Sequence, residues 1–187
     1  MAKRPLTRQR ILRAALRLID REGLEALSMR KLGAALGVEG MALYRHVGNK
    51  ERLLEGVVEL LLEELELPPA GSASWADAWL ALARSYRRLA RSHPGAFRLL
   101  ALSPLSTAAR FERAQAPVAI LRDAGFDEHH AQLAFRTLLS YADGYLLREL
   151  ADGDTDLSPE EAEAAFDFGI RAILTGLDHH LAAAQPR

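Results

Sequence analysis

One stretch, SMRKLGAALGVEGMALYRHVGNK at residues 28–50, constrains the fold of this chain more than any other. Ser28 is a residue type that caps helices, and Gly37 one that ends them cheaply in a left-handed conformation. The apolar residues between them that we expect on one helix face are Leu32, Ala35 and Leu36. After the turn, a second short helix carries Leu43 and Val47 inward. Two short helices joined by a tight turn, the second able to lie in a DNA major groove, indicate a helix-turn-helix.

Basic side chains are concentrated in the same part of the chain. Residues 1–55 contain twelve Lys and Arg and six Asp and Glu, which gives a charge of +6, whereas the remaining residues carry −7. A basic head on an acidic body indicates that the head meets a polyanion. Arg-rich helix faces can also be simply solvated, so charge alone leaves both interpretations open. The helix-turn-helix pattern favours nucleic acid.

The rest of the chain also carries helix signals, and no strand-like alternation persists. Apolar periodicity and breaker residues predict further helices at about 7–22, 49–66, 74–93, 94–102, 104–124, 127–150 and 158–184. Their start signals include Thr7, Asn49, Asp127 and a capping box at 158–161. We therefore expect an all-α chain.

The clearest boundary is the Pro- and Gly-rich cluster at 67–73. It predicts a helix-turn-helix DNA-binding domain at 1–50, a linking helix at 49–66, and a helical ligand-binding and dimerisation domain at 67–187. Residues 1–6 are predicted to be a short basic arm.

Several other classes of site are excluded or disfavoured by the sequence. The chain has no cysteine, so disulfides and thiol-ligated metals are excluded. No apolar run is long enough to span a bilayer, and we expect a cytoplasmic protein. Asp152–Asp156 superficially resembles a calcium loop, but Leu157 stands where such a loop needs glycine. Adjacent histidines on a helix do not share a face, so we expect neither a metal nor a cofactor.

The segment LSMRKLGAALGVEGMALYRHVGNKERLL resembles the DNA-binding head of the tetracycline-repressor (TetR) family of bacterial regulators. The body resembles the tetracycline-repressor branch more loosely, through its Leu-Pro-Pro-Ala-Gly and Ser-Trp segments and the Tyr86-Arg-Arg run. The resemblance implies a two-fold dimer that binds a DNA operator and is usually a repressor released by a small molecule. It also implies a regulator rather than an enzyme.

The resemblance further implies roles for matching positions in the head. Contact with phosphate or a groove edge is expected from the start of the first short helix, at Ser28, Arg30 and Lys31. The positions that should face the bases are Gly40, Met41, Ala42 and Arg45. Contact with the DNA backbone is expected from Tyr44, His46 and Lys50. Because Gly40, Met41 and Ala42 replace polar side chains of the tetracycline repressor, readout should lean on Arg45 and on apolar contact with thymine methyl groups. Tyr44 as a packing aromatic and His46 as a helix-end histidine remain open alternatives.

For the body, the resemblance implies a pocket for a small molecule. Candidate lining residues are Tyr86, Phe97, Leu100, Phe135, Tyr141 and Tyr145. Each of them could equally be an ordinary core residue. The polar groups expected to hold tetracycline and its magnesium are replaced by Leu82, Leu99 and Leu100. We therefore expect a mainly hydrophobic effector other than tetracycline.

The last two long helices have wide apolar faces, which predicts a homodimer formed through them. Two alternative functions stay open at this stage. One is a multidrug-binding regulator or module with weak DNA contact, and the other is an activator instead of a repressor. An enzyme with Tyr86, Asp143 or His130 as acid or base would need a perturbed group that the sequence does not demand.

Overall fold

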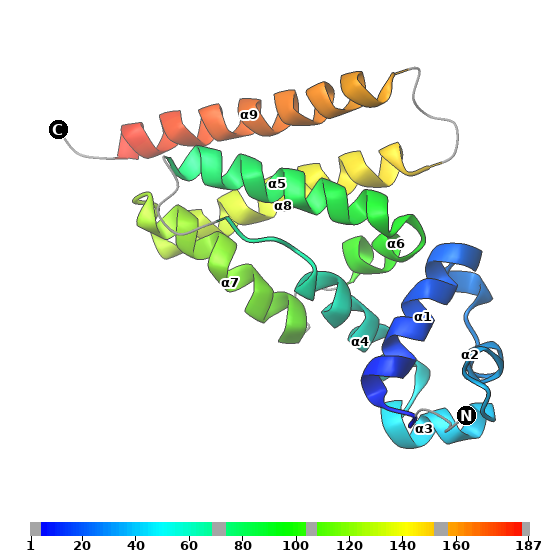
Figure 1. Ribbon diagram of the computed structural model, residues 1–187. Helices are drawn as coiled ribbons and strands as arrows, with labels where there is room; N and C mark the ends of the chain where they lie inside the picture. The colour runs from blue at the N-terminus through cyan, green and yellow to red at the C-terminus, as the bar shows by residue number, and fades with distance from the viewer. Residues whose placement is uncertain (1–4, 69–73, 104–107, 152–156, 185–187) are drawn as a thin grey trace. The chain divides into compact units, whose positions relative to one another are not determined.

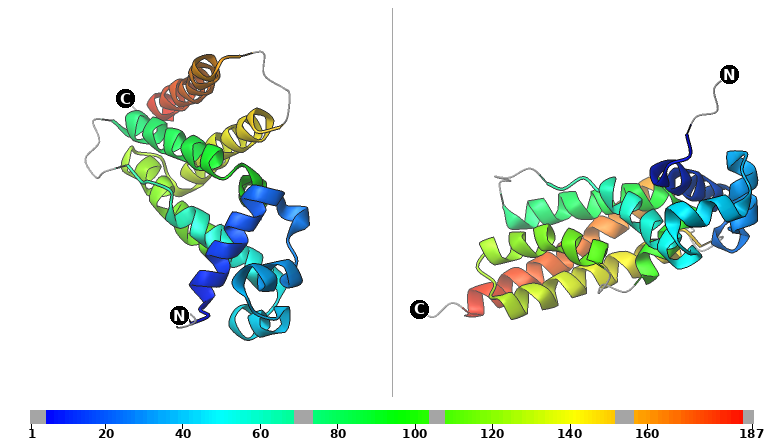
Figure 2. Two further views of the ribbon diagram at one scale, coloured as in Figure 1. Left: turned by 45° about the vertical axis from the view of Figure 1, so that its right-hand side comes forward. Right: turned by 90° about the horizontal axis from the view of Figure 1, so that it is seen from below.

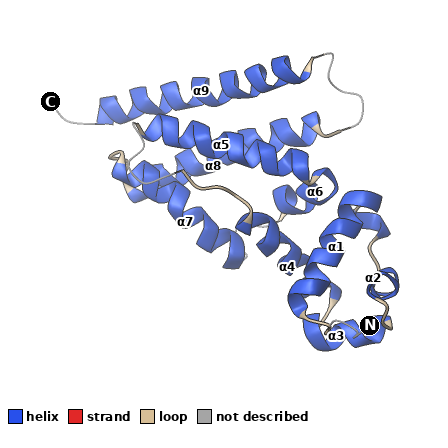
Figure 3. Ribbon diagram, viewed as in Figure 1, coloured by secondary structure: helices blue, strands red, loops and turns tan. Residues whose placement is uncertain are grey.

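The computed structural model describes residues 5–68, 74–103, 108–151 and 157–184, and within these ranges all regular structure is helical (Figure 1, Figure 3). The α-helices are α1 (Arg8–Glu22), α2 (Met29–Leu36), α3 (Gly40–Val47), α4 (Lys50–Glu63), α5 (Trp75–Ser92), α6 (Pro94–Leu102), α7 (Ala108–Asp123), α8 (Glu128–Glu149) and α9 (Pro159–Ala184). The all-α prediction is confirmed. Residues 1–4 of the basic arm predicted at 1–6, most of the breaker cluster and the acidic segment 152–156 lie outside the described residues.

Local capping explains where the helices begin. The side-chain oxygens of Thr7, Ser28, Asn49 and Asp127 each accept a hydrogen bond from a backbone N–H three residues on. These bonds satisfy donors that the first turn of a helix leaves unpaired. The four caps were all predicted from residue type, and the structure confirms them.

The predicted capping box at the start of α9 is also present. The Ser158 backbone N–H donates to Glu161 Oε2 at 2.8 Å, and the Glu161 N–H donates to Ser158 Oγ at 3.2 Å. The reciprocal bonds hold the first turn of the longest helix.

Two local predictions were wrong. The linking helix α4 ends at Glu63 and not at 66. Ala35 is exposed, and the buried residues of α2 are Leu32, Gly33 and Leu36. Ala35 can be exposed because its methyl group is small and its exposure to water costs little. Gly33 is buried because α3 packs closely against it, which a hydrophobicity pattern does not predict.

The chain forms two compact units, which we describe separately. The first comprises Met1–Glu64 with His93–Arg110, and the second comprises Leu65–Ser92 with Phe111–Arg187. The first unit therefore contains α1 to α4 and also α6. Its core is formed by fully buried side chains from each of the first four helices, namely Ile11, Ile19, Leu32, Leu43, Leu53 and Leu61.

Helix α6 is attached to α1 by a close backbone approach and by polar contacts. A Cβ at Gly95 would overlap the Ile19 carbonyl group, so only glycine allows this approach. The Asp20 carboxylate accepts from the Ala96 N–H at 3.3 Å and lies 2.7 Å from His93 Nδ1. His93 Nε2 lies 2.8 Å from Glu64 Oε2, just after α4. His93 thus joins three segments of the first unit.

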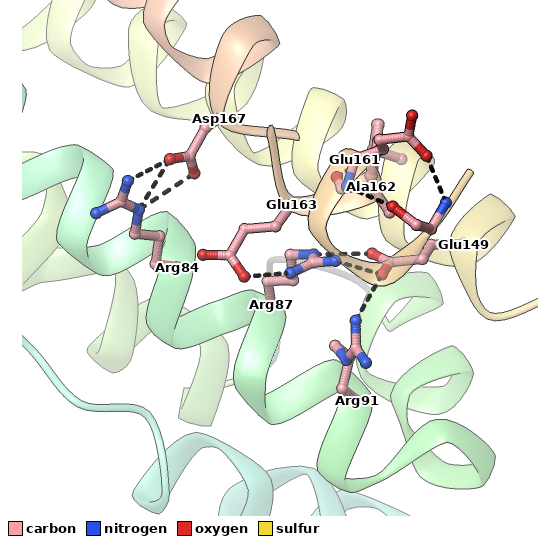
Figure 4. Close-up of polar contacts among 10 residues, drawn as sticks. Arg84, Arg87, Arg91, Glu149, Glu161, Ala162, Glu163 and Asp167 are labelled. Carbon is pink, nitrogen blue, oxygen red and sulfur yellow. Dashed lines mark hydrogen bonds and ion pairs between the residues drawn. The ribbon is translucent and has the colours of Figure 1, made fainter. Parts of the chain in front are cut away.

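In the second unit, α5 and α8 both pack against α9, as two views show (Figure 1, Figure 2). Phe166 on α9 and Leu138 on α8 are among the fully buried side chains of this unit. The Arg87 guanidinium donates two hydrogen bonds to Glu149, at 3.0 and 2.7 Å, and both side chains are almost fully buried (Figure 4). A buried charge needs such a partner, and this pair ties α5 to the last turn of α8.

Within the described ranges, no helix combines the length and apolar character that crossing a membrane requires.

The two carboxylates around His93 predict a pH-dependent stability. Burial of the ring opposes its charged form, but hydrogen bonds to Asp20 and Glu64 outweigh burial and raise the pKa of His93. The charged ring therefore stabilises the fold fully below pH 6.5, the ordinary histidine pKa, and this contribution is lost as pH rises through the raised value. We expect His93→Gln to cost about 1 kcal/mol more at pH 5.5 than at pH 9 in urea unfolding, a figure reduced for the exposure of Glu64.

The control is His129→Gln, because His129 forms no ion pair with any described residue. An equal loss at both pH values for His93→Gln would show that the ring contributes by packing alone.

Candidate nucleic-acid interface

Two glycines set how closely α2 and α3 approach each other. A Cβ at Gly33 would lie 2.8 Å from the Gly40 nitrogen and from the Val38 oxygen, and a Cβ at Gly40 would lie 2.9 Å from the Met29 oxygen. Gly37, between the helices, has a φ of 71°, in the left-handed region. The tight turn predicted from the sequence is therefore held by backbone-to-backbone contact.

This contact decides which side of α3 faces solvent. Leu43 and Val47 are buried, as predicted, and they anchor α3 to the core of the first unit. Met41 is 73% exposed and Tyr44 is 38% exposed. Tyr44 and Arg45 follow Met41 at spacings of three and four residues, so the three share one side of α3, and this exposed side is a candidate contact surface.

Arg45 and His46 extend this exposed face toward the C-terminal end of α3. Neither forms an ion pair with a described residue, so both are available to an anion. Ala42 is half-buried. Gly40 does not point outward as the sequence analysis expected, because it is pressed against α2. Its contact with DNA stays a prediction.

The predicted contacts at the start of α2 lie on the surface. Ser28 Oγ accepts from the Lys31 N–H at 3.2 Å, and Arg30 is exposed. Lys31 Nζ lies 3.3 Å from Glu22 Oε2. Hydrogen bonds from Arg21 and then Lys31 hold the pKa of the Glu22 carboxyl below its ordinary value. A phosphate near Lys31 would therefore compete with a carboxylate.

A basic pocket lies beside the exposed face of α3 and within the first unit. It has a volume of about 370 Å³. Its lining residues are Arg8, Tyr44, Arg45, His46, Val47, Gly48, Arg52 and Glu55. Three arginines against one carboxylate give the lining a positive charge, and arginine N–H groups match phosphate oxygens in geometry. The pocket therefore suits an anionic group of phosphate size and charge.

Arg8 and Arg52 were missed as site residues by the sequence analysis. Arg8 lies at the start of α1, and its guanidinium is 2.8 Å from Glu59 Oε2 on α4. The Arg52 side chain lies over Gly48, which has a φ of 79°. Lys50, predicted from the same segment, is exposed at the first position of α4. Arg8 could not be found from spacing because 36 positions separate it from Tyr44.

The six residues predicted to line an effector pocket are divided between the two compact units, and the pocket itself stays a prediction. Phe97 and Leu100 are buried in the first unit, whereas the other four belong to the second. Tyr145 donates to the Ala162 carbonyl at 2.8 Å, and Tyr141 donates to carbonyls of Ala165 and Phe166 at 3.4 Å, so these two hydroxyls bond to α9. Burial raises the pKa of both tyrosines, and they remain donors at neutral pH.

The remaining two candidates lie between α5 and α8. The Tyr86 hydroxyl donates to Asp143 Oδ1 at 2.7 Å. The Phe135 ring lies 6.2 Å from the ring of Trp79, which was not among the predicted pocket residues. In the part of the chain that the structure describes, no group of three or more His, Asp or Glu side chains is placed to hold a metal ion.

Two family models match the chain. One, described as bacterial regulatory proteins of the tetR family, matches residues 11–57, which include the helix-turn-helix and the start of α4. The other, described as a tetracyclin repressor-like C-terminal domain, matches residues 79–173. Together they cover both parts of the chain for which the sequence analysis noted a resemblance.

Curated relatives agree with these models. A tetracycline repressor protein of class E from Escherichia coli is 31% identical over 192 residues, covering 91% of this chain and 90% of that protein. An HTH-type transcriptional regulator from Saccharopolyspora erythraea is 33% identical over 144 residues and 77% of this chain. The chain spans 61% of the length of that regulator.

Solved structures share the fold along most of the chain. A substituted TetR from Acinetobacter baumannii in complex with minocycline has 29% identity and a TM-score of 0.82, and the match covers 95% of this chain and 99% of that one. BioQ with its double-stranded DNA operator has 25% identity and a TM-score of 0.77, covering 92% and 98%.

Proposed function

Because the chain belongs to the TetR family of DNA-binding transcriptional regulators, we propose that it is a homodimeric repressor released from a palindromic operator by a small, mainly hydrophobic effector. The observation that carries the DNA-binding part is the exposed face of α3 beside a pocket lined by Arg8, Arg45 and Arg52. The family models and relatives are those of regulators, which supports a regulator over an enzyme. Binding to chromosomal DNA would place the protein in the cytoplasm.

We assign base reading to the exposed side of α3. Arg45 is long enough to reach guanine O6 and N7, and Met41 and Ala42 can contact thymine methyl groups. The DNA-binding domain is proposed to be residues 1–50, as the sequence indicated. BioQ, a structural relative, is known with its operator bound, which supports this use of the fold.

Backbone contacts are assigned to the surrounding polar groups. The basic pocket is lined by Tyr44 and His46 and by Arg8 and Arg52. A phosphate would be held there by charge and by the paired N–H groups of arginine. Ser28, Arg30, Lys31 and Lys50 extend the contact to neighbouring phosphates. Arg45 also lines the pocket, so its assignment to a base needs a direct test.

The base-reading role of Arg45 is tested with Arg45→Ala. Operator DNA is first selected from a random pool, and affinities are then measured for the best sequence and for single-base variants. We expect a loss of about 1–3 kcal/mol on the best sequence and relaxed preference at one base position.

Arg52→Ala is the matched control. We expect it to weaken binding evenly over all sequences and to lower the salt slope by about one. If Arg45→Ala gives the same even loss, Arg45 binds phosphate. If the wild type prefers no duplex over competitor DNA, the proposed function is wrong.

The dimer is supported by groups on α8 and α9 that the chain itself leaves uncovered. Phe168 is 76% exposed and Leu133 is 48% exposed. A Cβ at Gly144 or Gly176 would meet nothing within 4 Å, although glycine inside a helix costs about 1 kcal/mol relative to alanine. A partner helix packed against these positions would account for both features. Two heads one DNA helical turn apart could then read a palindrome together.

We expect Phe168→Glu to convert the dimer to a monomer, because it places a charge in the proposed apolar interface. Light scattering at micromolar concentration should show half the wild-type mass, and affinity for the palindromic operator should fall at least tenfold. Leu102→Glu, a change at another exposed leucine, should leave the dimer intact. A wild type that is monomeric, or a dimeric Phe168→Glu, would contradict the proposed interface.

The proposed effector is apolar and is not tetracycline. Leu82 and Leu100 are buried, and Leu99 is half-buried, so none of these positions offers a polar group to a tetracycline-magnesium chelate. Minocycline is the ligand in the A. baumannii TetR structure, which has 29% identity with this chain. Similarity at that level establishes the fold, whereas ligand choice depends on individual side chains.

We therefore expect no specific thermal stabilisation by tetracycline with magnesium. At a ligand concentration a hundredfold above a dissociation constant, binding would stabilise the native state by about 2.7 kcal/mol, which a thermal-shift measurement detects easily. The control is magnesium alone. A large shift that requires both tetracycline and magnesium would overturn this prediction.

Two alternative functions can be distinguished from the proposed one by experiment. A multidrug-binding regulator with weak DNA contact would show broad binding of unrelated apolar molecules and little operator selectivity. An activator would bind its operator with the same contacts but raise transcription from the neighbouring promoter.

A further inference from the structure

Trp79 is one of two described residues of the second unit that have a buried side-chain donor without a hydrogen-bond partner. The side chain is 5% exposed, and its Nε1 is buried without a hydrogen-bond partner among the described residues. An indole N–H is a donor only, and buried donors are nearly always paired in native proteins. This exception therefore needs a physical reason.

The surroundings of the Trp79 ring are apolar and aromatic. Its ring lies 6.2 Å from that of Phe135 on α8, at an angle of 56°. Leu82 and Ala83, which follow on the same part of α5, are buried. By contrast, the buried hydroxyl of Tyr86, two turns further on, donates to Asp143. The fold thus supplies an acceptor for the neighbouring hydroxyl and none for the indole.

A second unpaired donor belongs to the same unit. Arg113 Nε on α7 is also buried without a partner in the described part of the chain, while its Nη2 donates to the Leu65 carbonyl at 2.7 Å. Among the described residues, no buried side-chain acceptor is left unpaired. The buried side-chain atoms without a hydrogen-bond partner are therefore both donors. A molecule that pairs with either of them must have an acceptor atom.

We propose that the Trp79 indole N–H donates a hydrogen bond to an oxygen acceptor on the effector, and that the effector is an aromatic molecule with a carbonyl-type oxygen. This inference rests on the proposed function, in which the second unit binds the effector. An aromatic effector would pack against the Trp79 and Phe135 rings, and the Trp79 N–H would select the position of one oxygen on it.

The test compares two probes that share a skeleton, 1-tetralone, which has a ketone oxygen, and tetralin, which lacks it. Dissociation constants are measured for the wild type, for Trp79→Phe, which keeps an aromatic ring but loses the N–H, and for Trp75→Phe as the matched control. We expect Trp79→Phe to weaken the binding of 1-tetralone about five- to tenfold and to leave the binding of tetralin unchanged. Trp75→Phe should affect the binding of both probes equally.

A second measurement uses the wild type and so does not depend on how the variant folds. The chain has two tryptophans, so its nitrogen–proton NMR spectrum contains two indole signals, which Trp75→Phe assigns. We expect 1-tetralone to move the Trp79 indole proton downfield and tetralin to move it much less. Equal weakening of both probes by Trp79→Phe, an indole proton that responds equally to both, or binding of neither probe would overturn the proposal.

Operator binding without a probe is measured on the same preparations. Trp79→Phe should bind the operator as the wild type does, because Trp79 belongs to no part of the DNA interface. If the wild type binds no operator, the proposed function is wrong. The probe measurement would then still decide whether Trp79 donates a hydrogen bond to a ligand oxygen.

Discussion

The candidate interface depends on the backbone contact between α2 and α3. Gly33 and Gly40 let the two helices meet at a distance that any side chain would prevent, and this contact fixes the rotation of α3 about its axis. With Leu43 and Val47 turned into the core, the same rotation leaves Met41 and Arg45 in solvent. A bulkier residue at either glycine would tilt α3, so the exposed face would no longer present its side chains to a groove. The proposed recognition surface would thus depend on two residues that need not touch DNA themselves.

What the sequence predicted correctly is local. Caps at Thr7, Ser28, Asn49 and Asp127 act over three residues, and helical periodicity acts over a few turns, so residue type and spacing suffice for both. The contacts that it did not predict join distant segments. His93 meets Asp20 across 73 positions, and the arginine at position 8 reaches the basic pocket only because α1 packs on α4. No periodic pattern encodes such pairs, since each depends on how whole helices pack.

In the second unit, the aromatic character of a residue does not by itself distinguish a ligand contact from a core residue. Six residues were predicted to line a pocket on the ground that they are large and apolar or aromatic, yet Tyr141 and Tyr145 use their hydroxyls to bond to α9. The informative property is whether a buried polar atom already has a partner. By that criterion Trp79 stands apart from the tyrosines. Hydrogen-bond status is a property of the packed structure, so sequence could not supply it.

The proposed release of a repressor from its operator would set an energetic requirement that one hydrogen bond cannot meet. Moving a two-state equilibrium from 1:99 to 99:1 takes about 5.5 kcal/mol of differential affinity, whereas a neutral hydrogen bond contributes about 0.5–1.5 kcal/mol. The remainder corresponds to roughly 200 Å² of apolar surface buried in one conformer and not in the other. The chain passes between the two compact units after Glu64, Ser92 and Arg110. Within the first unit, His93 and Gly95 fix α6 to α1, so a displacement of α6 would be passed on to α1. Apolar burial would therefore drive the release, and Trp79 would select which molecule causes it.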